Sequence, residues 1–202
     1  LGRKFQVGIP ESSSYNTFFN WQYNFSDNVE LYGSTHYGQL IAKPMAYYRY
    51  GMNSPEPKHP LMQEIFPDGD GFLPYERGDS RDKSFVSGLR GDTDGGWSWD
   101  VGATWGSNRV SYVTYNTVNF AFLNDFGYTP RDIHDGVLTS SQASLDIAIA
   151  KSLGDNWNLG FGAQYLHQNY KIEAGELASW YVGTSGVPGA AQGFAGWGPA
   201  DA

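Results

Sequence analysis

Cysteine is absent from the sequence, which excludes a disulfide scaffold, a cysteine-ligated zinc site and a thiol nucleophile. Charged residues are scarce as well, at 17% of the chain against the usual ~25%. The charges present sum to −8, with a sequence pI near 4.8, so the basic surface that nucleic-acid binding requires is missing. No apolar run approaches the ~20 residues of a transmembrane helix. We therefore expect no nucleic acid among the partners and no membrane-spanning helix.

Glycine and aromatic residues, in contrast, are abundant. The 202 residues include 26 glycines, and 16% are aromatic, which is too many rings and too little charge for a disordered chain. The length is sufficient for one globular domain with its own core. The chain opens on Leu1 without an initiator Met and closes on 198–202, a segment that suits no packed element. We expect an internal piece of a longer, processed protein; a complete domain with trimmed ends is the alternative.

Apolar and polar residues alternate over unusually long stretches. Two of them, 96–105 and 156–165, alternate without a break, and 15–26 does so with Phe18 as the exception. A period of two predicts β-strands. Each stretch has a partner strand across a short turn near 27, 94 or 155, so we expect three hairpins at about 14–41, 83–115 and 141–174.

Long connections lie between the predicted hairpins, at about 51–82, 116–140 and 175–202. Connections beyond ~12–15 residues are uncommon in compact domains and are usually functional. The short turns therefore fall at one end of the sheet and the long loops at the other.

The length of the strands and the composition of their faces favour a membrane over a soluble sheet. Strands of soluble proteins most often run ~5–6 residues, whereas a tilted strand needs ~9–11 to cross a bilayer. The apolar face is rich in Trp, Tyr and Phe close to the short turns, where a membrane barrel has its interfacial rings. The other face carries Asn, Gln, Ser, Thr and Gly, which suit water or a polar plug. In a bilayer only a closed barrel pairs every backbone group.

The sequence thus predicts an all-β fold, an antiparallel transmembrane β-barrel segment of about six strands. A large soluble β-sandwich or propeller is the alternative. Six strands cannot enclose a plugged lumen, which favours a piece of a larger barrel. The residues expected to face lipid are Phe19, Trp21, Trp97, Trp99, Val101, Trp105, Trp157, Leu159 and Phe161.

Five motifs resemble segments of TonB-dependent outer-membrane receptors. Residues 157–180 contain a glycine-alternating strand, a Tyr, and the Ala-Gly-Glu-Leu-Ala-Ser entry into a loop. The others lie at 15–32, at 47–49, at 66–74 and at 88–91, and the likeness extends from about residue 6 to the end. Gln164 stands where an acidic residue is common, and Leu166-His167 where an Arg is expected. These departures weaken any inference from the ligands of this family to the ligand of this chain.

The resemblance implies a barrel of about 22 strands with an N-terminal plug, in the outer membrane of a Gram-negative bacterium. Such receptors import scarce, bulky solutes (a ferric chelate, cobalamin, an oligosaccharide or a peptide) with energy delivered by TonB. The plug and the TonB-contacting segment are not in this sequence, which would supply part of the wall and the outer loops. Outer-membrane lipid, lipopolysaccharide and the solute are the partners expected. The alternative is a structural or adhesive outer-membrane barrel without active transport; a soluble carbohydrate-binding β-domain is more distant.

Candidate sites are confined to the long loops. We find no catalytic constellation and expect no cofactor. At 68–71 a turn is favoured over a calcium site. At 131–135 solvated loop residues are favoured over metal ligands. Rings stack on sugars or chelates and Arg binds carboxylates, so mixed aromatic–Arg loops are candidates for ligand binding, with an outer aromatic girdle as the equal alternative. These residues are Tyr47, Tyr48, Arg49, Phe72, Tyr75, Arg77, Phe126, Tyr128, Arg131, Trp180 and Tyr181. The Gly-rich segment 183–198 is expected to be a mobile outer loop.

Overall fold

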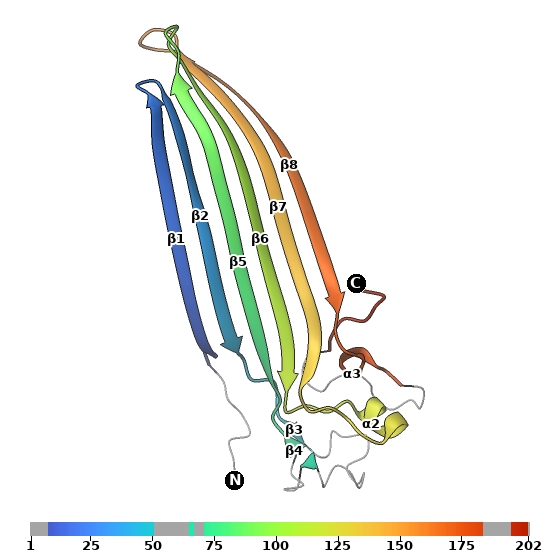
Figure 1. Cartoon of the computed structure of the whole chain (residues 1–202). Helices are drawn as coiled ribbons and strands as arrows, with labels where there is room; N and C mark the ends of the chain where they lie inside the picture. The colour runs from blue at the N-terminus through green and yellow to red at the C-terminus, as the bar shows by residue number, and fades with distance from the viewer. Residues whose placement is uncertain (1–7, 51–64, 67–70, 184–194, 202) are drawn as a thin grey trace.

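Six long antiparallel strands form one sheet in the computed structural model, which describes residues 8–50, 65–66, 71–183 and 195–201. The strands are β1 (Glu11–Ser26), β2 (Val29–Lys43), β5 (Tyr75–Asp92), β6 (Trp97–Tyr115), β7 (Ile133–Ser152) and β8 (Asn158–Ala174). Their order in the sheet is β1-β2-β5-β6-β7-β8, so every strand lies beside its neighbour in the chain (Figure 1). The prediction of an all-β fold with six antiparallel strands is confirmed.

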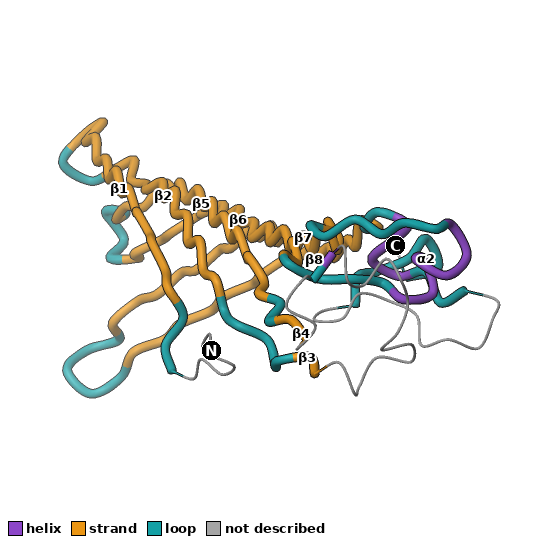
Figure 2. Tube along the Cα trace, turned by 90° about the horizontal axis from the view of Figure 1, so that it is seen from below, coloured by secondary structure: helices purple, strands orange, loops and turns teal. Residues whose placement is uncertain are grey.

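The sheet is curved and open. Seen from the loop end, the strands follow one another in a single row (Figure 2). Among the described strands, β1 and β8 each have a partner on one side only. Closure into a barrel is therefore not present in this chain by itself. No helix in the described part of the chain is long and apolar enough to span a membrane.

The strands extend further toward the loops than the alternation predicts. We expected strands to begin near 83 and 141, but β5 begins at Tyr75 and β7 at Ile133, so the loop boundaries at 82 and 140 were wrong. The added part of β5 carries charged residues on both faces, and therefore shows no apolar alternation that sequence reading can detect. Pairing holds it in the sheet: Arg81 lies opposite Gln39 of β2 and Arg109 of β6.

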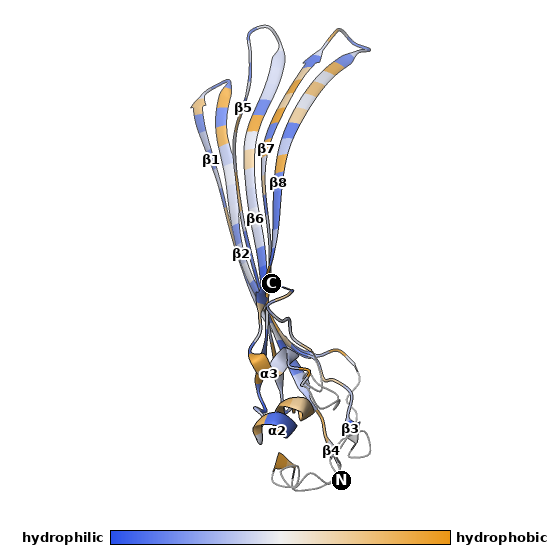
Figure 3. Ribbon diagram, turned by 90° about the vertical axis from the view of Figure 1, so that its right-hand side faces the viewer, coloured by the Kyte–Doolittle hydropathy of each residue, from blue (hydrophilic) through white to orange (hydrophobic). Residues whose placement is uncertain are grey.

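Hydrophobicity is distributed unevenly along the sheet. Figure 3 shows hydrophobic residues mainly in the half nearest the short turns and more hydrophilic residues toward the loops. The buried hydrophobic side chains, by contrast, lie mainly at the loop end, in two small clusters. A two-stranded sheet of β3 (Arg49–Tyr50) and β4 (Gly71–Phe72) and the helices α2 (Phe120–Phe126) and α3 (Leu177–Trp180) build this end.

Helix α2 was not expected, and capping explains why it forms. The Asn119 side chain accepts a hydrogen bond from the N–H of Phe122 at 3.0 Å, and Gly127 ends the helix with φ +74°. Asn119 also donates to the carbonyls of Ala178 and Tyr181, both at 2.8 Å. A single buried amide thus joins the loop after β6 to the segment after β8.

Candidate functional site

One face of the sheet forms a continuous apolar surface across all six strands. The register aligns Tyr23, Leu31, Leu89, Val101, Ile147 and Ala163 in one row, and the rows on either side continue it. We call this surface the apolar band. Side chains on it are solvent-exposed: Phe19 is 62% exposed and Phe161 58%. Eight of the nine residues expected to face lipid share this face, and the ninth, Trp157, directly precedes β8 at 74% exposure.

Charged residues appear on the same face only beyond the apolar band, except for Lys151 beside the short turns. On the loop side of Phe85 and Trp105 this face carries six cations against three carboxylates, in a chain of net charge −8. We call this region the charged belt. Its members are Lys43, Arg77, Arg81, Lys83, Arg109 and Lys171, with Glu11, Asp79 and Glu173.

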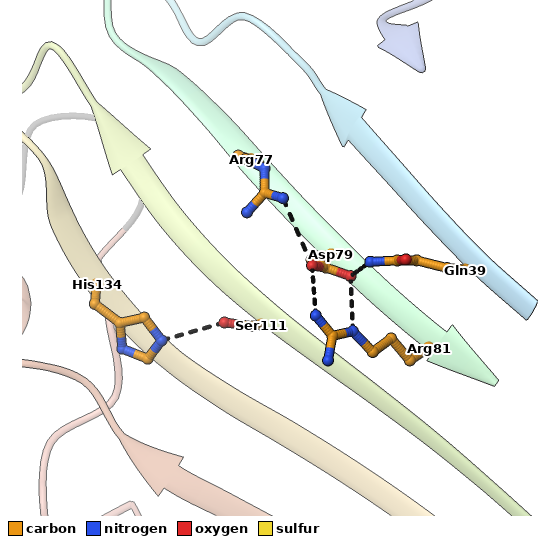
Figure 4. Close-up of polar contacts among 6 residues, drawn as sticks. All are labelled: Gln39, Arg77, Asp79, Arg81, Ser111 and His134. Carbon is orange, nitrogen blue, oxygen red and sulfur yellow. Dashed lines mark hydrogen bonds and ion pairs between the residues drawn. The ribbon is translucent and has the colours of Figure 1, made fainter. Parts of the chain in front are cut away.

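Asp79 lies at the centre of the charged belt, as Figure 4 shows. Its carboxylate accepts hydrogen bonds from Gln39 at 2.7 Å and from Arg81 at 3.2 and 3.3 Å, and Arg77 lies 3.6 Å away. His134 of β7 contacts the Ser111 hydroxyl at 3.2 Å on the same face. His134 is therefore a half-buried strand residue, and its assignment to a solvated loop was wrong.

The opposite face is polar and hollowed. Tyr32 donates a hydrogen bond to Asp100 at 2.7 Å, and Arg90 forms an ion pair with Glu30. A shallow cavity of about 1040 Å³ lies between these side chains and the short turns. The curvature of the sheet therefore turns the polar face inward and the apolar band outward.

The residues predicted to bind ligand gather in separate groups at the loop end. Phe126, Tyr128 and Tyr181 surround the buried Phe122 ring, with centroid distances of 4.5 to 5.7 Å. Phe126 and Tyr128 remain 49% and 61% exposed. These two rings, one at the end of α2 and the other just beyond Gly127, are therefore both accessible from solvent.

A second group surrounds Phe66. The Phe72 ring stacks on Phe66 at 4.3 Å, and the Arg131 guanidinium lies 4.7 Å from the Phe66 ring centroid. Phe72 is only 5% exposed. Its ring therefore belongs to the core of the loop end rather than to a ligand-accessible surface.

The remaining candidates are dispersed. Tyr75 and Arg77 lie in β5, whereas we expected them in a loop. The Tyr75 ring stacks on the Tyr115 ring, with 5.0 Å between the ring centroids. Tyr47 is 78% exposed, Tyr48 and Arg49 are half-buried beside β4, and Trp180 donates to the Gly175 carbonyl at 3.3 Å.

Sequence reasoning missed Asp135, which lies in a β-bulge of β7 and is fully buried. Thr114 donates to its Oδ2 at 2.7 Å, while Oδ1 has no hydrogen-bond partner among the described residues. Burial raises the pKa of Asp135 to about 7, and the nearby carboxylates of Glu76 and Glu176 contribute in the same direction. In the sequence Asp135 is one of the charged residues of 131–135, which are expected in a solvated loop. Its burial under the segment after β8 is seen only in the structure.

Nothing in the described part of the chain assembles three or more His, Asp or Glu side chains in a way that could hold a metal ion. The possible calcium turn at 68–71 lies mostly outside the described residues, as does most of the Gly-rich segment 183–198. Comparison of the chain with protein-family models, curated proteins and solved structures found no match.

Proposed function

We propose that this chain is part of the wall and outer loops of a TonB-dependent outer-membrane receptor, which imports a scarce, bulky solute such as a ferric chelate, cobalamin, an oligosaccharide or a peptide. The observation that carries the proposal is the apolar band. This solvent-exposed, aromatic-rich surface covers one face of the sheet only and ends where the charged belt begins. The likeness of five sequence motifs to this family supports the choice of a TonB-dependent receptor among outer-membrane barrels.

The height of the apolar band approaches that of a bilayer. On β6 it runs from Trp97 to Trp105, which at about 3.3 Å per residue is about 26 Å along the strand. With the usual strand tilt of about 40° this corresponds to about 20 Å, most of the ~25 Å height of the apolar band in outer-membrane barrels. A soluble sheet would instead cover such a surface with a second layer, because large exposed apolar patches cause aggregation.

The two edges of the sheet support a larger barrel. In hydrocarbon every backbone N–H and C=O must be paired, so β1 and β8 would each need a further strand. The polar inner face, with its charged pairs, suits a water-filled or plugged lumen. Together these features favour a wall segment over a self-contained domain.

The loop end would then be the first part of the receptor to meet the solute. Phe126 and Tyr128 offer two exposed rings beside Asp125, whose carboxylate accepts a hydrogen bond from Tyr181 at 2.8 Å. Rings flanked by polar groups bind flat apolar surfaces such as sugar faces or chelate rings. No catalytic residue is assigned in this proposal, in which the chain binds and does not react.

A paired substitution tests the membrane part of the proposal. Phe161→Arg would place a charge on the apolar band and should lower the free energy of unfolding in vesicles by about 2–4 kcal/mol. Gln164→Arg is the matched control, three residues along β8 on the polar face, and should fold nearly as well as the unmodified protein. Both are made in the full-length protein and compared by urea titration in lipid vesicles. Equal losses would contradict a lipid-facing apolar band.

A structural or adhesive outer-membrane barrel is the second candidate, favoured by the loop end having packed cores of its own. Cells with and without functional TonB separate the two functions. A receptor should lose uptake of its solute when TonB is removed, whereas an adhesive barrel should support the same attachment in both strains. Uptake is measured with candidate solutes from each of the four classes.

A further inference from the structure

We propose that the segment after β8 completes the aromatic patch of Phe126, Tyr128 and Tyr181, and that this segment leaves the sheet when Asp135 beneath it ionises. The segment comprises residues 175–183 and 195–201 of the described chain. The inference rests on the proposed function, because it concerns the rings that would meet the solute. It adds a pH-dependent control of those rings.

The segment after β8 is held on the bulge of β7. The Trp197 N–H donates to the Asp135 carbonyl, and the His134 N–H donates to the Glu176 carboxylate at 3.2 Å. A bond of 2.9 Å from the Gly175 N–H to the Trp197 carbonyl joins the two parts of the segment. Beneath these contacts the Asp135 side chain is fully buried, and its Oδ1 has no hydrogen-bond partner among the described residues. A charge there is costly, so the closed segment favours the protonated acid.

The charged groups that act on Asp135 are carboxylates. Glu76 approaches from β5 and Glu176 from the segment itself, and both oppose ionisation; within the described residues Asp135 has no ion pair. His134, which precedes it on β7, bonds instead with the Ser111 hydroxyl. Burial together with these carboxylates raises the pKa of Asp135 from 3.8 to about 7, and burial raises the pKa of Glu76 as well. Closing is therefore favoured at low pH and loses stability as the pH rises from about 4 to about 7.

The same segment supplies one ring of the aromatic patch. The Tyr181 ring centroid lies 5.7 Å from that of Phe122 and 5.3 Å from that of Phe126. The Tyr181 hydroxyl donates to Asp125 at 2.8 Å, and Asn119 donates to the Tyr181 carbonyl at 2.8 Å. Contacts on β7 and contacts on α2 thus hold one short stretch of chain, so that opening at β7 weakens the patch.

Helix α2 has an anchor of its own. Its residues Phe120 and Leu123 are buried in the cluster around Phe66, which includes no residue of the segment after β8. Opening of the segment would therefore leave the rings of α2 in place and remove Tyr181 from them. A solute that contacts rings on both sides should bind more tightly at acidic pH than above pH 7.

Maleimide labelling of single cysteines in the full-length protein, folded in vesicles, tests the switch, since this chain has no native cysteine. Two fully buried positions serve as reporters: Ser179→Cys, which Gly196 covers, and Ala121→Cys on α2, which Gly183 covers. Each rate is divided by that of Asn124→Cys, an exposed position of α2, to remove the pH dependence of the thiol itself. Both corrected rates should rise about tenfold or more between pH 5 and pH 7, because each measures the opening equilibrium.

Two variants identify the titrating group. Asp135→Asn cannot ionise and should remove the pH dependence at both reporters, whereas Asp132→Asn, an exposed carboxylate near the start of β7, should retain it. Equal pH dependence in Asp135→Asn and in the unmodified protein would overturn the proposal. A corrected rate that rises at Ser179 and stays flat at Ala121 would also overturn it, because the segment would then open without releasing Tyr181.

A second measurement covers poor assembly of Ala121→Cys. Hydrogen exchange at the Tyr181 amide, which donates to the Leu177 carbonyl at 2.9 Å, should follow the same pH dependence in the unmodified protein. Neither measurement uses a solute, so the two proposals fail differently. Solute uptake that is unaffected by loss of TonB would contradict the proposed function alone, and flat labelling beside TonB-dependent uptake would overturn the switch alone.

Discussion

Protonation of Asp135 should decide how firmly the segment after β8 is held on the end of the sheet. Two backbone contacts hold that segment on β7: Trp197 N–H donates to the Asp135 carbonyl at 3.0 Å, and Glu176 N–H to the His134 carbonyl at 2.9 Å. Asp135 is 0% exposed beneath them. Opening of the segment would expose the Asp135 carboxyl to water.

The sign and size of the effect follow from the two pKa values. Burial raises the pKa of Asp135 from 3.8 to about 7 in the closed state. Because the closed state binds the proton more tightly than the open state, closing is unperturbed below pH ~4 and loses stability as the pH rises to about 7, above which the loss is constant. The difference corresponds to at most about 4 kcal/mol, or up to about a thousandfold in the closing equilibrium.

Hydrogen exchange at the Trp197 and Glu176 amides measures this equilibrium, after correction for the intrinsic exchange rate. Protection should fall by up to about tenfold per pH unit between pH 4 and 7 in the unmodified protein. Asp135→Asn keeps an acceptor for Thr114 without a charge, so its protection should stay constant with pH and exceed that of the unmodified protein at pH 8.

Asp132→Asn is the control, since Asp132 is an exposed carboxylate near the start of β7 and its neutralisation should leave the pH dependence unchanged. The reasoning is refuted if the unmodified protein shows pH-independent protection, or if Asp135→Asn retains the same slope.

Two smaller substitutions test packing. Gly33→Ala adds a methyl group that would collide with the Trp21 ring and with the Val86 carbonyl, so the unfolding free energy in vesicles should fall by about 1–3 kcal/mol. Gly106→Ala is the control, because the nearest atom to its methyl group would be 3.8 Å away, and it should be neutral in the same urea titration. Asn119→Ala removes the cap of α2 and both bonds to the segment around α3, and should cost about 2–4 kcal/mol locally. Limited proteolysis within 119–131 detects this loss, and Asn124→Ala, an exposed residue of the same helix, should not change the cleavage rate.

Alternation identified three of the six strands of the sheet. Period-two patterns at 15–26, 96–105 and 156–165 predicted the strands β1, β6 and β8 and placed the apolar residues of each on one face, because a side chain's face in a strand depends only on whether its position is odd or even. The turn residues predicted the hairpins for the same local reason. Alternation could not detect the outer ends of β5 and β7, because the first carries charged residues on both faces and the second places the apolar Val137 and Leu138 side by side. Both ends are strands because neighbouring strands pair with them.

The loop end and the charged belt depend on contacts between distant parts of the chain. Arg81 and Arg109 are unremarkable in the sequence and become neighbours only when the register of β5 and β6 is fixed. Asp135 acquires its raised pKa because Thr114 and the segment around Trp197 cover it, and those residues lie far from it in sequence. The sequence by itself determined which face of each strand is apolar, since that is a local property of the backbone. Only the tertiary structure decided which charges meet and which are buried, because burial and Coulomb interactions depend on distances in space.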